Sequence, residues 1–184
     1  MENLFNFIAT VVVVVAAVDL LRIMRYTVKR YTVKKINNEQ RVLKFLRLKP
    51  NAKVPTRGSL HSAGHDLYAC LEESVVVKPN ETVKIPTGFA LEIPNGYVGL
   101  IFARSGLATK KGIAPANKVG VCDSDYRGEY VVALKNSGSE EVVINSGDRI
   151  AQLVVMPVLD VKFSEVEALS ETGRGEGGFG STGV

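Results

Sequence analysis

The stretch ETVKIPTGFALEIPNGYVGLIFAR, residues 81–104, decides the fold class. It contains two runs rich in β-branched and aromatic residues, 81–94 and 96–104, which are interrupted by Pro, Asn and Gly. Valine, isoleucine and aromatic side chains favour β-strands, whereas Pro, Asn and Gly form the turns between them. The stretch therefore predicts short strands joined by tight turns.

The same pattern continues through most of the chain. Further runs of this kind are RVLKFLRLK (41–49), ESVVVKP (73–79), GEYVVALKN (128–136), EEVVINSGD (140–148) and RIAQLVVMPV (149–158). Beyond residue 40, only SGLATKKGI (105–113) suggests a helical turn. Many short strands with polar turns predict an all-β domain at residues 41–161, as a sandwich, barrel or jelly roll. The last strand is expected to end near Val161, leaving residues 162–184 as a C-terminal arm.

The N-terminal part has a different composition. Residues 1–24 form an apolar leader, whose uncharged stretch at 3–18 is slightly shorter than the roughly 20 residues of a membrane-spanning helix. A basic linker follows at residues 25–40 and contains RYTVK twice. A membrane anchor at residues 4–24, with the basic stretch on the cytoplasmic side, agrees with the positive-inside rule. Translation from Met24, or an apolar leader without a membrane role, are the alternatives.

Charge and cysteine content limit the partners and the compartment. Residues 22–53 hold eleven Lys or Arg against the single acid Glu39, whereas residues 54–184 hold twelve basic and sixteen acidic residues. The net charge of +4 thus belongs to the N-terminal extension, and we expect no nucleic-acid partner for the main domain. Cys70 and Cys122 are too few for a disulfide framework and favour reduced thiols in a cytoplasm-like compartment.

Two polar clusters interrupt the first half of the strand pattern, at strand-to-loop junctions where functional groups are commonly displayed. SAGHDLYA (62–69) contains Asp66, which either stabilises its own turn or faces a hydrated cation. ARSGLATKKG (103–112) brings together a guanidinium, a hydroxyl and free backbone N–H groups. This combination suits phosphate, although a capped turn with a surface arginine has the same sequence pattern.

Two more clusters follow. NKVGVCDSDYRGEY (117–130) contains Asp123 and Asp125, which form either the tip of an acidic hairpin or a general base for water beside bound phosphates. SGDRIAQLVV (146–155) contains the neighbours Asp148 and Arg149, which we interpret as a structural ion pair. Gln152 is polar within an apolar strand and therefore needs a hydrogen-bonding partner.

The chain ends in TGRGEGGFGSTGV, residues 172–184, in which six of thirteen residues are glycine. Glycine has no side chain to pack and loses much conformational freedom on ordering. The stretch is therefore either a disordered end or a flexible strap that closes over a ligand. Its arginine, phenylalanine and hydroxyl side chains would suit a nucleotide, but the spacing does not match a Walker phosphate-binding loop.

In this order and spacing, AGHDLYA, RSGLA, GVCDSDYRGE, GDRIAQL and RGEGGFGSTG resemble the five motifs of the dUTPase family, the trimeric deoxyuridine triphosphate nucleotidohydrolases. The resemblance covers residues 43–184. It implies an all-β, distorted jelly-roll or β-barrel subunit in a homotrimer, with active sites at subunit junctions. It also implies hydrolysis of dUTP to dUMP and pyrophosphate, with Mg²⁺ on the triphosphate. The sequence departs from the family pattern at Ala103, where proline is common, and at Cys122, where Ile or Val is usual.

The resemblance also implies a role for each motif residue. Asp123 would activate the water that attacks the α-phosphorus, and Asp66 would contact the hydrated Mg²⁺ through water. Tyr126 would pack under the deoxyribose, and Phe179 would stack over the uracil. The remaining contacts would be made to the α- and β-phosphates by Arg104, Ser105, Gly106 and Gln152, to the uracil by Asn117, Gly120, Val121, Cys122 and Val131, and to the outer phosphates by Arg174, Gly180, Ser181 and Thr182.

Three other functions are weaker interpretations. A dCTP deaminase would need a catalytic glutamate and a different hairpin in place of DSDYRG. A regulatory nucleotide-binding protein, or a membrane-tethered scaffold, would not require the full set of motif residues around Asp123. The thiol of Cys122 beside the base site also predicts sensitivity to thiol-blocking reagents.

Overall fold

The computed structural model describes residues 18–26, 42–178 and 181. The chain divides into two compact units, Met1–Leu43 and Lys44–Val184. In the first unit, residues 18–26 are helical and exposed. No helix in the described part of the chain is long and apolar enough to cross a membrane. Most of the candidate anchor at residues 4–24, and most of the basic linker at 25–40, lie outside the described residues.

The described part of the second unit consists of short strands and one helix, as the sequence predicts. The strands are β1 (Lys44–Arg47), β2 (Thr56–Arg57), β3 (His65–Tyr68), β4 (Val75–Val77), β5 (Thr82–Pro86), β6 (Phe89–Glu92), β7 (Tyr97–Phe102), β8 (Ile113–Pro115), β9 (Gly120–Cys122), β10 (Val131–Asn136), β11 (Val142–Ile144) and β12 (Arg149–Pro157), and the helix is α2 (Ser105–Lys111).

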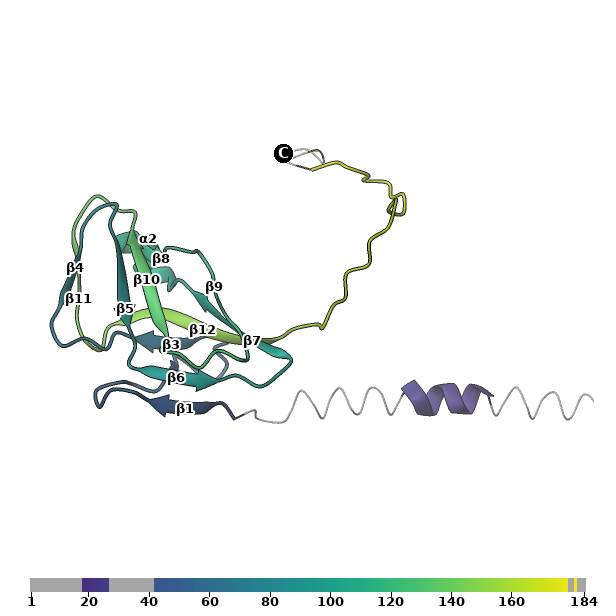
Figure 1. The fold of residues 1–184 in the computed structure, drawn as a ribbon, viewed down its shortest axis with the longest axis horizontal. Coiled ribbons are helices and arrows are strands. Elements are labelled where there is room, and N and C mark those ends of the chain that lie inside the picture. Colours follow the sequence, from purple (N-terminus) through teal and green to yellow (C-terminus); the bar gives the residue numbers. More distant parts are fainter. Residues whose placement is uncertain (1–17, 27–41, 179–180, 182–184) are drawn as a thin grey trace, which may run out of the picture. The chain divides into compact units, whose positions relative to one another are not determined.

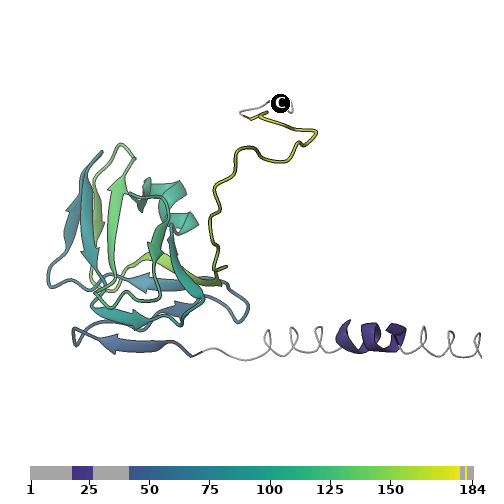
Figure 2. The ribbon, with the colours of Figure 1, turned by 45° about the vertical axis from the view of Figure 1, so that its right-hand side comes forward.

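These strands form four antiparallel sheets, which Figures 1 and 2 show around a shared interior. The largest sheet has the order β2-β3-β12-β7-β9, and a second has the order β5-β10-β8. The pairs β1-β6 and β11-β4 complete the unit. Strands that are distant in sequence thus become neighbours, as when β12 lies between β3 and β7. The arrangement agrees with the predicted all-β class.

The core contains side chains from all four sheets. Alternation decides which residues contribute, because successive residues of a strand face opposite sides. In β10, for example, Val132, Leu134 and Asn136 are buried while Val131 and Lys135 are exposed. Burying one large aliphatic side chain contributes roughly 1.5–3 kcal/mol. The shared core therefore holds the sheets together and fixes the loops between them.

Two boundaries differ from the sequence-based expectation. The last strand, β12, ends at Pro157 rather than near Val161, and every residue from 156 to 176 is exposed. The chain there has no sheet neighbour to bury its apolar side chains. The expected single turn after Arg104 is the longer helix α2, which ends at Gly112 with a φ of 67°. A Cβ at Gly112 would come within 2.5 Å of the Gly138 nitrogen, so the turn requires glycine.

Candidate active site

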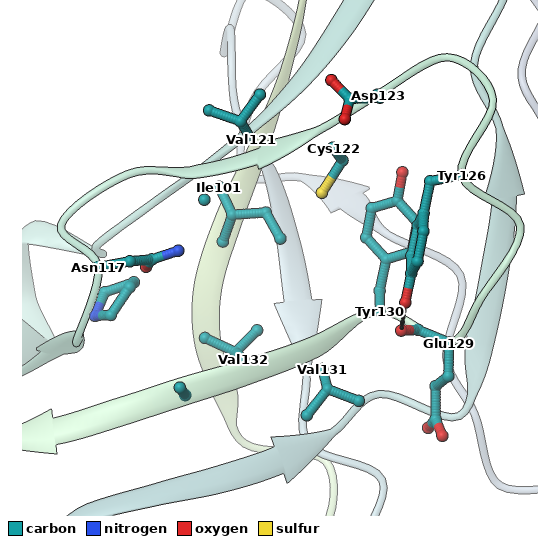
Figure 3. A pocket seen from close by; sticks show the side chains of 13 residues that line it. Ile101, Asn117, Val121, Cys122, Asp123, Tyr126, Glu129, Tyr130, Val131 and Val132 are labelled. Atoms are coloured by element: carbon teal, nitrogen blue, oxygen red, sulfur yellow. Dashed lines mark hydrogen bonds between the residues drawn. The ribbon is translucent and has the colours of Figure 1, made fainter.

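A cleft of about 300 Å³ opens between β9 and the beginning of β10 (Figure 3). β9 is the last strand of its sheet, with β7 as its neighbour. β10 pairs with β8 only from Leu134 onward, and the preceding residues 131–133 line the cleft instead. Because strand edges present unpaired backbone N–H and C=O groups, the two walls can hydrogen-bond the edge of a planar ligand. All the residues predicted to read the base line this cleft, namely Asn117, Gly120, Val121, Cys122 and Val131.

Asp123 and Tyr126 also line the cleft. Asp123 follows β9 directly and is exposed, and its carbonyl accepts a hydrogen bond from the Tyr126 N–H at 3.2 Å. The Tyr126 ring is 44% exposed, and its hydroxyl donates to the Glu129 carbonyl at 2.9 Å. Asp125 is not among the residues that line the cleft. The turn thus separates the two acidic residues and presents one carboxylate next to an aromatic face.

The floor of the cleft contains Cys122 and Tyr130. Burial raises the pKa of the Cys122 thiol. Burial, followed by the neighbouring Cys122, raises the pKa of Tyr130 far above neutral pH. Both groups therefore stay protonated at neutral pH, and since cysteine reacts as its thiolate, Cys122 should react slowly with thiol reagents. Sequence reasoning missed Tyr130, because nothing local marks its hydroxyl as buried.

A second cavity, of about 400 Å³, lies at the beginning of α2. We call it the cationic cradle, because Arg104, Lys110, Lys111 and Arg149 line it. Ser105, Gly106 and Gln152 also contribute to its lining, so the structure brings together the residues predicted to bind the α- and β-phosphates. The first N–H groups of a helix lack intrahelical acceptors, and those of α2 follow Arg104 directly. Positive charge and free donors therefore converge in the cradle.

Asp66 orients two of these arginines. Its Oδ1 accepts a hydrogen bond from Arg104 Nε at 2.7 Å, and its Oδ2 accepts one from Arg149 Nη1 at 3.2 Å. The Asp66 side chain is only 12% exposed, which shields both contacts from solvent. A guanidinium has five N–H donors, so each arginine keeps donors for a bound anion. Each oxygen of Asp66 accepts one hydrogen bond from an arginine and keeps a second acceptor site, so the carboxylate can also bind a water molecule.

The predicted ion pair between Asp148 and Arg149 is wrong. Arg149 binds Asp66, while Asp148 Oδ2 accepts a hydrogen bond from the Asn145 N–H at 2.8 Å. Neighbouring residues in an extended chain point in opposite directions, so these two side chains diverge. The pairing of β12 with β3, which shifts register between Arg149 and Ala151, brings Arg149 to Asp66 instead. A pairing between distant strands cannot be read from the local sequence.

Gln152 finds the partner that its place in an apolar strand requires. It lies opposite Asp66 in the pairing of β12 with β3, and its Nε2 donates to the Ala103 carbonyl at 2.8 Å. A Cβ on Gly64 would collide with Oε1 of Gln152. Gly64, two residues before Asp66, therefore makes room for the Gln152 side chain. The hydrogen bond to the Ala103 carbonyl fixes this side chain at the wall of the cradle.

The described residues of one chain do not bring every predicted group together. The cleft and the cradle have no lining residue in common. Arg174 is exposed, and its Nε donates to the Gly177 carbonyl at 2.7 Å rather than reaching either cavity. Ser181 is exposed as well. Phe179, Gly180 and Thr182 lie outside the described residues.

The described residues contain no group of three or more His, Cys, Asp or Glu side chains that could hold a metal ion. Mg²⁺ usually keeps several water ligands and binds through one or two carboxylates together with substrate phosphates. The carboxylates at hand, Asp123 at the cleft and Asp66 at the cradle, fit an ion that arrives on phosphate. They do not fit an ion enclosed by protein ligands.

The fold and the two cavities define a class, an all-β protein with a cleft for a planar ligand and a cationic cradle for an anion. The family model described as dUTPase matches residues 50–183. The chain therefore belongs to the dUTPase family. A deoxyuridine 5′-triphosphate nucleotidohydrolase of Desulfitobacterium hafniense is 52% identical over 141 residues, which cover 76% of this chain and 93% of that protein. One of Anaplasma marginale is 50% identical over 131 residues, covering 71% and 89%.

Solved structures agree with this assignment. The G164S mutant dUTPase of Staphylococcus bacteriophage 80alpha, solved with dUpNHpp, superposes with a TM-score of 0.70 at 31% identity and covers 79% of this chain and 100% of that chain. The D95N mutant dUTPase of phage phi11 of S. aureus, in which a structural Mg(II) ion is coordinated, has a TM-score of 0.64 at 29% identity, with coverage of 70% and 98%.

Proposed function

We propose that this protein hydrolyses dUTP to dUMP and pyrophosphate, which keeps uracil out of DNA and supplies dUMP for thymidylate synthesis. Membership of the dUTPase family supports the reaction. The observation that carries the proposal is the position of Asp123, whose carboxylate directly follows β9 and lines the cleft beside the exposed Tyr126. A nucleotide whose base enters the cleft would bring its sugar and α-phosphate to that carboxylate.

The cleft would recognise uracil mainly by backbone groups. The edge of β9 and the beginning of β10 offer N–H and C=O groups in fixed positions, apart from the Ala133 carbonyl, which accepts a hydrogen bond from the Ala116 N–H. Asn117 adds an amide. Cytosine presents the reverse donor and acceptor pattern and would leave buried polar groups unpaired, which is costly. The methyl group of thymine would meet the cleft wall. Tyr126 would pack under the deoxyribose and leave no room for a 2′-hydroxyl.

Asp123 would act as the general base. Its carboxylate would accept a proton from the water that attacks the α-phosphorus, a role that typically contributes a factor of about 10²–10⁴ in rate. Arg104, Ser105, Gly106 and Gln152 would bind the α- and β-phosphates in the cradle. Phosphoryl transfer depends mainly on positioning and charge stabilisation, and the arginines held by Asp66 support that role. Mg²⁺ bound to the triphosphate would neutralise part of its charge.

The complete site would require several subunits. The cleft and the cradle are separate cavities of one chain, and an exposed segment, residues 158–176, follows the last strand. Both observations support a homotrimer in which one subunit's cleft meets another's cradle. The C-terminal arm would close over the substrate, with Phe179 on the uracil and Arg174, Gly180, Ser181 and Thr182 on the outer phosphates. A flexible closing segment of this kind excludes water from the site.

A reducing, cytoplasm-like compartment completes the proposal, because Cys70 and Cys122 are both free. Attachment to a membrane through residues 4–24 is a separate proposal that rests on the apolar leader alone. Membrane fractionation of the full chain, compared with a chain that begins at Met24, tests it. Equal recovery of both chains in the soluble fraction would contradict the attachment.

The reaction is tested by measuring pyrophosphate release from dUTP, dCTP, dTTP and UTP. We expect turnover of dUTP well above the other three, and a fall of about 10²–10⁴-fold in kcat for Asp123→Asn. Asp125→Asn, next in the same turn but away from the cleft, is the matched control and should keep its activity. Absence of dUTP turnover by the wild type, or an undiminished rate in Asp123→Asn, would contradict the proposal.

A further inference from the structure

Tyr130 carries a polar group to which the proposed chemistry gives no role. Its side chain is 1% exposed, and its hydroxyl is buried without a hydrogen-bonding partner among the described residues. Leaving a buried polar group unsatisfied costs about 1–3 kcal/mol. Phenylalanine would keep the ring packing and avoid that cost. A hydroxyl retained in this position therefore calls for an explanation in the site that it lines.

The backbone and the ring of Tyr130 are held from the side of β5 and β6. Its N–H donates to the Phe89 carbonyl at 2.9 Å, and its carbonyl accepts hydrogen bonds from the backbone N–H and the hydroxyl of Thr87. The ring stacks on Phe89 with centroids 5.5 Å apart and meets Tyr126 at 5.9 Å. These contacts leave the hydroxyl little freedom to turn away from the cleft.

Figure 3 shows the hydroxyl of Tyr130 on the side of the cleft where Cys122 lies, without a hydrogen bond between them. The hydroxyl of Tyr126 points the opposite way, to Glu129. Both the phenol and the thiol stay protonated, because their pKa values are raised. The contact is therefore a packing contact between two neutral groups, without a hydrogen bond. It links the two walls of the cleft.

Cys122 is the residue through which such a link would affect substrate recognition. It lies in β9 between Val121, whose backbone would read the base, and Asp123. β9 has only three residues and one neighbouring strand, β7. The side of β9 that faces the cleft has no paired strand to hold it. A side chain packed against Cys122 can therefore determine the distance between β9 and β10.

We propose that Tyr130 is a specificity-determining positioning residue, whose hydroxyl packs beside Cys122 and thereby keeps the cleft too narrow for a methyl group on the pyrimidine ring. The inference rests on the proposed function, since it assigns the cleft to the base of dUTP. A single methyl group is worth only about 10–200-fold in discrimination when a pocket can yield. If the Tyr130 side chain keeps β9 from moving outward, the cleft excludes the methyl group more strictly.

The test is Tyr130→Phe, which removes the hydroxyl and keeps the ring. We expect the ratio of kcat/KM for dUTP to that for dTTP to fall about tenfold, with the melting temperature unchanged or higher because an unsatisfied group is gone. Cys122→Ala, which removes the side chain that the hydroxyl packs against, should lower the same ratio, and the double variant should fall no further than either single variant. Tyr68→Phe, which removes a tyrosine hydroxyl bound to Thr56 away from the cleft, is the matched control.

A ratio that Tyr130→Phe leaves unchanged, in an enzyme that turns over dUTP, would overturn the inference and leave the proposed function intact. Additive losses in the double variant would also overturn it, because they would show that Tyr130 does not act through Cys122. The dissociation constants of dUMP and dTMP provide a readout without turnover. If the wild type binds dUMP but hydrolyses no dUTP, the proposed function fails. A changed ratio of the dissociation constants of dUMP and dTMP in Tyr130→Phe would still support the positioning role of Tyr130.

Discussion

The cleft and the cradle recognise their parts of a nucleotide by different means. The walls of the cleft are strand backbone, and its floor consists of packed side chains such as Ile101 and Tyr130. The cradle is lined by charged side chains, and the carboxylate of Asp66 positions two of its arginines. Shape and backbone pattern therefore dominate in the first cavity, and charge dominates in the second.

This difference predicts different consequences of mutation. A change in the packing of the cleft should alter which base is accepted, because the wall moves while the charges stay. A change in the charges of the cradle should slow turnover of every triphosphate alike, because all of them carry the same phosphates. Tyr130→Phe examines the first half of this comparison, and the following variants examine the rest.

Among the variants that compare the two cavities, the largest effect is expected when both lose a contribution together. Deleting Gly173–Val184 removes the groups proposed to cover the uracil and the outer phosphates, while the barrel core ends before that segment. We expect kcat/KM for dUTP to fall by a factor of about 10² or more, because the loss of a single transition-state donor lowers the rate by a factor of about 10²–10³. Steady-state kinetics and size-exclusion chromatography measure the two properties. Full activity of the truncated chain would mean that the glycine-rich end has no function in catalysis.

A smaller effect is expected when only the cradle changes. Asp66→Asn removes the charge that holds Arg104 and Arg149, and we expect kcat/KM to fall about tenfold. This corresponds to about 1.4 kcal/mol, near the lower end of the range for a charge-assisted hydrogen bond. The dUTP-to-dTTP ratio should not change. Glu92→Gln, which breaks the exposed pair with Lys44, is the control and should leave kcat/KM unchanged, because exposed ion pairs contribute little. An altered base preference in Asp66→Asn would contradict the separation of the two roles.

The smallest effect concerns the pH dependence of stability and arises from His65, the neighbour of Asp66 in β3. Burial, together with the charge of Arg57, lowers the pKa of His65 below 6.5. The unfolded chain then binds a proton more readily than the folded one, so stability is complete above pH 6.5 and is lost as the pH falls towards the folded pKa. His65→Gln should flatten this loss in thermal melts recorded across that range. The exposed His61 offers the control His61→Gln, and an equal slope in wild type and His65→Gln would contradict the prediction.

Much of the candidate site could be predicted from the sequence, because its residues lie in short local motifs. Asp123 and Tyr126 occupy one turn, and Arg104 to Gly106 form one strand-to-helix junction, so their proximity follows from chain connectivity. Arg149 shows where this reasoning fails. Its neighbour in sequence, Asp148, is an obvious partner for an ion pair, but the pairing of β12 with β3 brings it to Asp66 instead.

The sequence by itself determined the all-β class and the residues of each motif, because alternation, turn residues and motif spacing are local properties of the chain. The tertiary structure alone decided how these residues are grouped. It placed the readers of the base between β9 and β10, gave Asp66 two arginines, and buried the hydroxyl of Tyr130 beside Cys122. The physical reason is that strand register and core packing depend on contacts between distant segments, and a local pattern does not specify those contacts.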